Sequence, residues 1–226
     1  MKNILFVLTS NDKMGDTDNK TGFWIEEFAA PYYILTDAGY DVTLASPQGG
    51  QPPIDPNSET EDAATEDTKR FDKDKKTQEV LANTKKLEDV DQKDFDAVFY
   101  PGGHGLLWDL VENKTSKKLI ESFLANDKPI SFVCHAPAIL KNIQDANGNA
   151  LVKGRNVTGF TNGEEKAVQL TDIVPFLIED MMKEKGANYS KIGDWEPYAL
   201  EDGLLITGQN PASSTKVADL LMKKLK

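Results

Sequence analysis

The stretch that decides the fold is Pro129–Leu140, which reads PISFVCHAPAIL. Its first part, Ile130–Val133, is continuously apolar and is typical of a strand buried on both faces of a sheet. Its second part, from Ala136 onward, has the pattern of a helix start. Between the two parts lie Cys134, the only cysteine of the chain, and His135, one of its two histidines. The sequence therefore predicts a strand-to-helix turn that places a thiol beside an imidazole.

The rest of the chain alternates between strand-like and helix-like segments. Strands are expected at residues 3–8, 40–45, 95–100, 130–133, 156–158 and 204–207, and helices at residues 22–38, 116–125, 136–143, 173–185 and 211–225. Pro31 interrupts the first helical pattern and predicts a kink or a division into two pieces. Alternation of this kind predicts an α/β fold with a parallel sheet between two layers of helices.

Residues 51–94 differ from the segments around them. They are rich in Asp, Glu and Lys and poor in apolar residues, a composition that on its own is typical of disordered sequence. We expect a charged, cap-like insertion that packs lightly on a single domain of 226 residues, with one helix at Lys75–Ala82. Most of its charged side chains are interpreted as a solvated face.

The composition argues against several classes of protein. The formal net charge is −11 at pH 7, which would repel nucleic-acid phosphates, and no basic patch is visible. The first apolar run is too short for a signal peptide, and no run is long enough to cross a membrane. A single cysteine cannot form an intrachain disulfide. We therefore expect a cytoplasmic globular protein with a small-molecule partner.

Cys134 follows the predicted strand at its carboxyl end, where parallel α/β sheets bind their ligands. The N–H groups of the following helix start would favour the thiolate, and a sharp turn would hold the thiol in a cleft. A buried structural cysteine is the alternative interpretation. The turn Pro101–Gly105 (PGGHG) also ends a strand. Its N–H groups and that of His135 could form an oxyanion hole.

Two adjacent acids, Glu26 and Glu27, lie in the first helical pattern. They project about 100° apart on a helix, so one can face the cleft while the other faces solvent. An acid beside a thiolate would have a raised pKa and could move protons. The spacing alone leaves open which of the two acids this is.

Five motifs taken together resemble the ThiJ/PfpI superfamily, and most closely its HchA-like class of stress chaperones and glyoxalase III enzymes. They are Thr21–Glu27 (TGFWIEE), Pro101–Gly105, the Cys134–His135 turn, Thr158–Asn162 (TGFTN) and Thr207–Ser213 (TGQNPAS). The resemblance covers nearly the whole chain. It implies a flavodoxin-like sheet of the class I glutamine amidotransferase type, with residues 51–94 as a small cap beside the site.

The resemblance also assigns roles to individual residues. Cys134 matches the nucleophile and His135 the adjacent histidine of a catalytic triad. Glu165 matches the third member, with Glu164 as the less favoured choice. The alignment of TGFWIEE places Glu27, rather than its neighbour, at the cleft acid. Two backbone N–H groups, those of Gly103 and His135, match the oxyanion-hole donors.

The activity implied by the resemblance is that of a glutathione-independent glyoxalase, a lyase of the glyoxalase III type. The Cys134 thiolate would attack the aldehyde of methylglyoxal, a small 2-oxoaldehyde. Glu27 would move protons, and water would release lactate. This route uses no cofactor and no metal ion. The resemblance further implies a homodimer, with protein deglycase and stress-chaperone activities toward glycated or unfolded proteins.

Two alternatives stay open. A cysteine peptidase or amidase would use the same triad of Cys134, His135 and Glu165, and a non-enzymatic holdase chaperone would use an exposed apolar patch. Among the other candidate residues, His104 is expected to be structural or to lie at the edge of the cleft. Trp195 and Tyr198, with the nearby Glu196, could line the pocket, and packing in the core is the favoured interpretation.

Overall fold

The computed structural model describes residues 2–226, and its centre is a seven-stranded sheet. The strand order is β3–β2–β1–β4–β5–β9–β8. These strands are β1 (Asn3–Val7), β2 (Asp41–Ser46), β3 (Lys85–Lys86), β4 (Ala97–Tyr100), β5 (Ile130–Val133), β8 (Ala199–Asp202) and β9 (Leu205–Gly208). Neighbouring strands are parallel except for β8 and β9, which form an antiparallel pair. The predicted α/β fold with a parallel sheet is therefore confirmed, except for the antiparallel edge strand β8.

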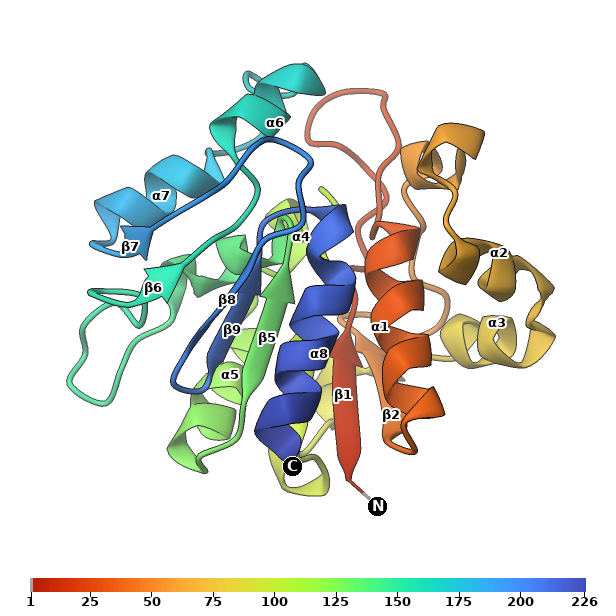
Figure 1. Cartoon of the computed structure of the whole chain (residues 1–226), viewed down its shortest axis with the longest axis horizontal. Helices are drawn as coiled ribbons and strands as arrows, with labels where there is room; N and C mark the ends of the chain where they lie inside the picture. The colour runs from red at the N-terminus through yellow and green to blue at the C-terminus, as the bar shows by residue number, and fades with distance from the viewer. Residues whose placement is uncertain (1) are drawn as a thin grey trace.

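Helices cover both faces of the sheet. The helix α1 (Ile25–Asp37) lies beside α8 (Ser214–Leu225) on one face, and α5 (Lys114–Ala125) lies on the other (Figure 1). The shorter helices are α2 (Glu66–Lys73), α3 (Lys75–Ala82), α4 (Leu106–Asp109), α6 (Asn162–Ala167) and α7 (Ile178–Glu184). A separate parallel pair is formed by β6 (Asn156–Val157) and β7 (Asn188–Tyr189). This arrangement is flavodoxin-like, as expected.

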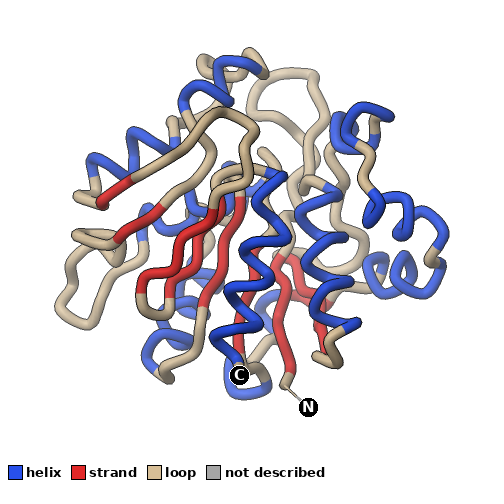
Figure 2. Tube along the Cα trace, in the orientation of Figure 1, coloured by secondary structure: helices blue, strands red, loops and turns tan. Residues whose placement is uncertain are grey.

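Apolar strands make the core of the molecule. Every residue of β4 and β5 is buried, as a strand between two helical layers requires. Phe6 on β1 stacks on Phe99 of β4 with ring centroids 4.7 Å apart. Because β5 lies between β4 and β9, the thiol at its end has the β4 turn on one side. Loops and short helices gather beyond this end of the sheet (Figure 2).

Two helices differ from the sequence-based expectation. Pro31 lies inside α1, yet α1 is one continuous helix. The burial of its apolar face against the sheet and α8 outweighs the loss of one backbone hydrogen bond. In the segment expected as a helix over residues 173–185, α7 begins only at Ile178. Pro175 disfavours helical geometry at the preceding residue and delays the helix.

The charged segment 51–94 packs more firmly than its composition indicates. Its predicted helix at Lys75–Ala82 is present as α3, and α2 precedes it. Three of its apolar side chains, Phe71, Leu81 and Leu87, are buried in the core. Its strand β3 adds to the edge of the sheet by pairing with β2. The segment is thus joined to the sheet at one end and to the loop before α1 at the other.

None of the helices described over residues 2–226 is both long and apolar enough to span a membrane.

Candidate active site

Cys134 lies on a sharp turn between β5 and a 3₁₀ helix at Ala136–Asn142. Its backbone φ is +60°, a left-handed conformation that costs an L-residue roughly 1–2 kcal/mol. Two backbone hydrogen bonds hold it there, from Cys134 N–H to the Gly208 carbonyl at 3.0 Å and from Phe160 N–H to the Cys134 carbonyl at 2.9 Å. The predicted strand-to-helix elbow is therefore present, and it buries the thiol to 3% exposure.

The structure brings together the three residues predicted for the triad. Cys134 Sγ lies 3.3 Å from His135 Nδ1, and His135 Nε2 lies 2.8 Å from Glu165 Oε2. All three side chains are buried. Glu165 belongs to α6, which lies at the carboxyl end of the sheet. The geometry matches that of a nucleophile, an adjacent base and a carboxylate that orients the base.

Glu164, the alternative to Glu165, has a different environment. Its Oε2 accepts the Thr161 N–H at 2.9 Å, and its Oε1 accepts the Trp195 N–H and the Asn210 amide, each at 2.8 Å. Glu164 thus caps the start of α6 and fastens two distant loops to it. Of the two acids, only Glu165 contacts His135.

His104 forms a contact that sequence reasoning missed. Its Nε2 lies 2.8 Å from Glu165 Oε1, so one carboxylate joins two imidazoles. The rings of His104 and His135 have their centroids 3.9 Å apart. Burial acts to raise the pKa of Glu165, but the two imidazoles lower it well below its ordinary value. A signal was available, because the PGGHG turn follows β4, the neighbour of β5 in the sheet.

Glu27 is fully buried in the first turn of α1. Its Oε2 accepts the Gly102 N–H at 2.7 Å, while Oε1 has no hydrogen-bond partner among residues 2–226. Burial raises the pKa of Glu27 to about 8, against the lowering effect of the neighbouring Cys134 thiol and the Gly102 N–H. At neutral pH this carboxyl therefore keeps its proton beside the thiol.

The adjacent acid, Glu26, points away from the thiol and toward the charged segment. Its Oε2 accepts the Thr65 hydroxyl at 2.5 Å. Partial burial raises the pKa of Glu26 to about 7. We expected the second acid to face solvent, and it is instead covered by the turn that begins α2.

The thiolate expected at Cys134 is not supported by the structure. Burial and the nearby Glu27 raise the pKa of Cys134 well above its ordinary value. The helix that follows is a short 3₁₀ helix with Pro137 in its first turn, and a proline has no N–H to stabilise an anion. Burial also lowers the pKa of His135, with His104 adding to the effect. The resting site therefore holds a thiol beside a neutral imidazole.

The PGGHG turn approaches the site closely. An added Cβ at Gly102 would lie 2.6 Å from Glu27 Oε2, and one at Gly103 would lie 2.5 Å from the Gly22 carbonyl. Gly103 also has a φ of +95°, so this position favours glycine. Within residues 2–226, neither Gly103 nor His135 donates its N–H to a backbone carbonyl. Both predicted oxyanion-hole donors are thus free of backbone acceptors.

A cavity of about 560 Å³ adjoins these groups at His104. It is lined by Met14, Asn19, Lys20, Trp24, Asp55, Pro56, Asn57, His104, Val168 and Leu170. The residues come from the loop before α1, the charged segment and the loop after α6. Cys134 and His135 are not part of this lining, so His104 lies between the cavity and the predicted triad.

Within residues 2–226, one group of side chains has the composition and proximity of a metal site. Ligand atoms of His104, His135 and Glu165 all lie within 4.8 Å of one another. The Nε2 atom of each histidine is within hydrogen-bond distance of the Glu165 carboxylate. These hydrogen bonds occupy both oxygens of the carboxylate and the Nε2 atom of each ring.

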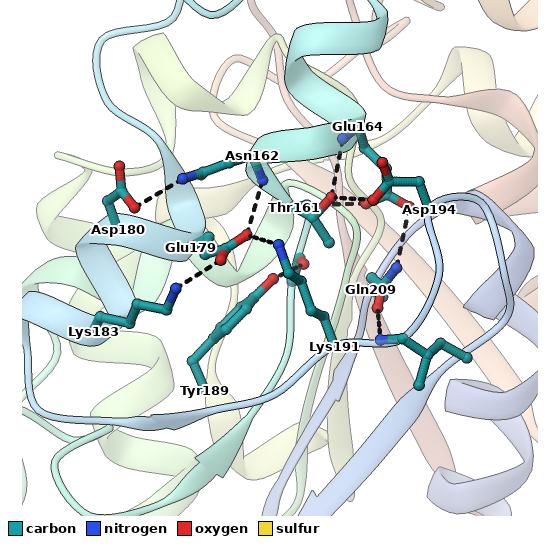
Figure 3. A network of polar contacts seen from close by, with 12 residues as sticks. Thr161, Asn162, Glu164, Glu179, Asp180, Lys183, Tyr189, Lys191, Asp194 and Gln209 are labelled. Carbon is teal, nitrogen blue, oxygen red and sulfur yellow. Dashed lines mark hydrogen bonds and ion pairs between the residues drawn. The ribbon is translucent and has the colours of Figure 1, made fainter.

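A polar network holds α6 in place (Figure 3). Glu179 accepts Lys183 Nζ and Lys191 Nζ, each at 2.7 Å, and the Asn162 N–H at 3.0 Å. Thr161 Oγ1 donates to Asp194 Oδ1 at 3.0 Å. Burial acts to raise the pKa of Glu179, but the two lysines lower it to about 2. Sequence reasoning missed this network because its members are spread over α6, α7 and the following loop.

Trp195 is not in the core as expected, because 47% of its surface is exposed. Its backbone has a left-handed φ of +66°, and its N–H is held by Glu164. The indole packs edge-on against Phe160 with ring centroids 5.8 Å apart, and Phe160 lies against His135 at 4.2 Å. The residue therefore forms an outer layer over the triad.

Comparisons with known proteins agree with this geometry. A chain named "Glyoxalase 3" from Candida albicans is 33% identical, over 97% of this chain and 96% of the relative. "Glutathione-independent glyoxalase HSP31" from Saccharomyces cerevisiae is 31% identical, over 96% of this chain and 95% of the relative.

Solved structures of similar proteins share the whole fold. The X-ray structure of Rapid Encystment Protein 24 KDa from Francisella tularensis is 39% identical, with a TM-score of 0.95 and 100% coverage of both chains. The crystal structure of glyoxalase III from Candida albicans is 32% identical, with a TM-score of 0.90 over 98% of this chain and 96% of that one. The DJ-1/PfpI family model matches residues 20–224. This chain belongs to the DJ-1/PfpI family.

Proposed function

We propose that this protein is a glutathione-independent glyoxalase that converts methylglyoxal into lactate. The observation that carries the proposal is Glu27, a buried carboxyl with a raised pKa and an unpartnered Oε1 beside the only thiol. A hydrolase needs only the triad, whereas an isomerisation at carbon needs a group that removes and returns a proton. The names of the relatives from Candida albicans and Saccharomyces cerevisiae support the same activity.

The first step joins the thiol to the aldehyde. Cys134 gives its proton to Nδ1 of His135 as its sulfur attacks the aldehyde carbon. Glu27, which is protonated, gives its proton to the aldehyde oxygen, and the N–H groups of Gly103 and His135 stabilise the charge that develops there. The product is a hemithioacetal, and Glu27 is left as a carboxylate in a buried site.

The second step moves hydrogen between the two carbonyl carbons. The Glu27 carboxylate removes the hydrogen from the former aldehyde carbon while His135 gives the proton it took from the thiol to the ketone oxygen, and an enediol forms. Glu27 returns its proton to the neighbouring carbon, and the hydroxyl on the first carbon gives its proton to His135 and becomes a carbonyl. One carbon is oxidised and the other reduced, so no external oxidant is needed. The result is a lactoyl thioester on Cys134, which water cleaves to lactate.

A cysteine peptidase or amidase is the second candidate, because the distances within the triad suit it equally well. The 3% exposure of Cys134 favours a small aldehyde over an extended peptide. We propose that deglycase activity uses the same thiol. Chaperone activity and a homodimer would use the four exposed large hydrophobic residues found over residues 2–226, which are Val168, Ile173, Ile192 and Trp195. We further propose a cytoplasmic location, where the thiol stays reduced.

The test is lactate formation from methylglyoxal without glutathione, by the reduced wild type and by Cys134→Ser. We expect turnover by the wild type and none by the variant. Hydrolysis of a peptide and of glutamine is measured in parallel. A folded, reduced wild type that cleaves an amide but makes no lactate would overturn the glyoxalase proposal in favour of the hydrolase.

A further inference from the structure

The proposed function leaves the last step, hydrolysis of the thioester, without a base. The structure contains a second histidine that the first two steps do not use. His104 and His135 contact opposite oxygens of the Glu165 carboxylate, each through Nε2 and each at 2.8 Å. The carboxylate thus orients two imidazoles in the same way.

The contacts with Glu165 decide which nitrogen of each ring carries the proton. Glu165 is ionised, because its pKa is lowered, and an ionised carboxylate only accepts hydrogen bonds. Each imidazole therefore presents an N–H at Nε2 to the carboxylate, and the tautomer with its single proton there has its lone pair at Nδ1. In His135 that lone pair meets the Cys134 thiol at 3.3 Å.

In His104 the same lone pair faces a different environment. Its Nδ1 has no hydrogen-bond partner among residues 2–226, since the only hydrogen bond of this side chain is the one to Glu165. Over residues 2–226, five fully buried side-chain atoms lack partners, and His104 Nδ1 is not one of them. This atom, which has no partner, is therefore not fully buried. The side chain is 8% exposed, against 1% for that of His135.

His104 also lines the cavity of about 560 Å³ described above. Its wall has four polar side chains besides His104, namely Asn19, Lys20, Asp55 and Asn57. Such a wall can hold water. The cavity does not touch His135, so the two histidines divide the site, with one facing the thiol and the other facing water.

We propose that His104 is a catalytic base for the hydrolytic step, which activates the water that releases lactate from Cys134. The proposal rests on the glyoxalase function proposed above. Nδ1 of His104 removes a proton from water as the water oxygen bonds to the thioester carbon. The carbon–sulfur bond then breaks, and the sulfur takes up the proton that His104 received. Glu165 serves both halves of the reaction, through His135 in acylation and through His104 in deacylation.

The central test is His104→Gln, because Nε2 of glutamine can still donate to Glu165 but the side chain has no basic nitrogen. We expect steady-state lactate formation to fall by roughly 10²–10⁴-fold. A burst of thioester, equal in amount to the enzyme, should precede the slow phase. Hydroxylamine should release this acyl group as lactohydroxamate and should speed the variant more than the wild type, because it attacks without a base.

Alkylation of Cys134 by iodoacetamide separates this role from a structural one. If His104 acts only on water, Cys134 in His104→Gln should be alkylated at the wild-type rate. Glu165→Gln is the matched variant, in which both alkylation and turnover should fall. His104→Asn serves as a second replacement, and circular dichroism checks that each variant is folded.

Each outcome bears on the proposal. A His104→Gln enzyme with wild-type turnover would overturn the role of His104 and leave the glyoxalase function intact. Loss of alkylation together with turnover, without an acyl burst, would show that His104 only supports Glu165, which also overturns it. A folded wild type that makes no lactate would overturn the function and this role together.

Discussion

The turn at Cys134 and the helix at Glu165 place the two ends of the predicted triad by different physical means. Cys134 is held by the backbone, with a left-handed φ of +60° between a buried strand and a 3₁₀ helix. Glu165 is held by side chains, since α6 has only six residues and depends on the contacts of Glu164 and Glu179. The first arrangement is local in the sequence, and the second joins residues from 161 to 210.

This difference predicts how substitutions in each region affect the site. A substitution at the elbow acts on the thiol directly. A substitution in the α6 network acts through the position of Glu165, and so on both histidines at once.

The largest expected effect is that of Glu165→Gln. An amide cannot orient both imidazoles as the carboxylate does, so turnover of methylglyoxal should fall by roughly 10²–10⁴-fold. The measurement is kcat and KM for lactate formation, with Glu164→Gln as the neighbouring control. Glu164→Gln should act mainly on stability, because Glu164 has no contact with either histidine. A larger loss of activity in Glu164→Gln would contradict the assignment.

The pH dependence of stability should report Glu27. Its pKa is raised from 4.5 to about 8 in the folded protein, so the folded state holds a proton that the unfolded state has lost. The stabilisation is complete below pH 4.5 and is lost as pH rises toward 8, with a slope of about 1.4 kcal/mol per pH unit for one group. Urea unfolding of wild type and Glu27→Gln between pH 5 and 9 measures it. The variant should lack this slope. If the free energy of unfolding of the two proteins changed in parallel with pH, Glu27 would not have a raised pKa in the folded state.

Glu179 should give the opposite dependence. Its pKa is lowered to about 2 from 4.5, so its stabilisation is present above pH 4.5 and is lost as pH falls toward 2. Glu179→Gln should lower the free energy of unfolding at pH 7 by about 1–3 kcal/mol, because Lys183 and Lys191 lose a charged partner. It should also reduce kcat through α6. Unchanged stability together with unchanged kcat would show that the network does not position Glu165.

The smallest expected effect compares two replacements at the elbow. Cys134→Gly and Cys134→Ala both remove the thiol and should both lack turnover. Glycine tolerates a φ of +60°, so the glycine variant should be more stable than the alanine variant by about 1 kcal/mol. Urea unfolding measures the difference. Equal or reversed stabilities would show that the turn is not strained.

The sequence was sufficient to predict those parts of the molecule that local patterns determine. The strand Ile130–Val133 and the helix Lys75–Ala82 have the predicted bounds. The alternation of strands and helices predicted the sheet, and the motifs indicated the residues that meet at its carboxyl end. The elbow was predictable because an apolar strand, one thiol and a helix start follow one another directly.

What the sequence did not predict depends on contacts between distant residues. The contact of His104 with Glu165 joins the β4 turn to α6, and the PGGHG motif indicates only the first of these two places. The expectation of a thiolate at Cys134 is not supported for a related reason. Burial and Glu27 oppose its ionisation, and neither can be recognised in the PISFVCHAPAIL stretch. The loop at Trp195 is anchored through its N–H to Glu164, which is 31 residues away.

The most direct test of the central claim compares Glu27→Gln with Glu26→Gln in lactate formation without glutathione. The two acids are adjacent in α1, and only Glu27 is buried beside the thiol. We predict that kcat/KM falls by at least about 10²-fold in Glu27→Gln and stays near the wild-type value in Glu26→Gln. An active Glu27→Gln enzyme would contradict the account, because the hydrogen transfer between the two carbons would then use another group.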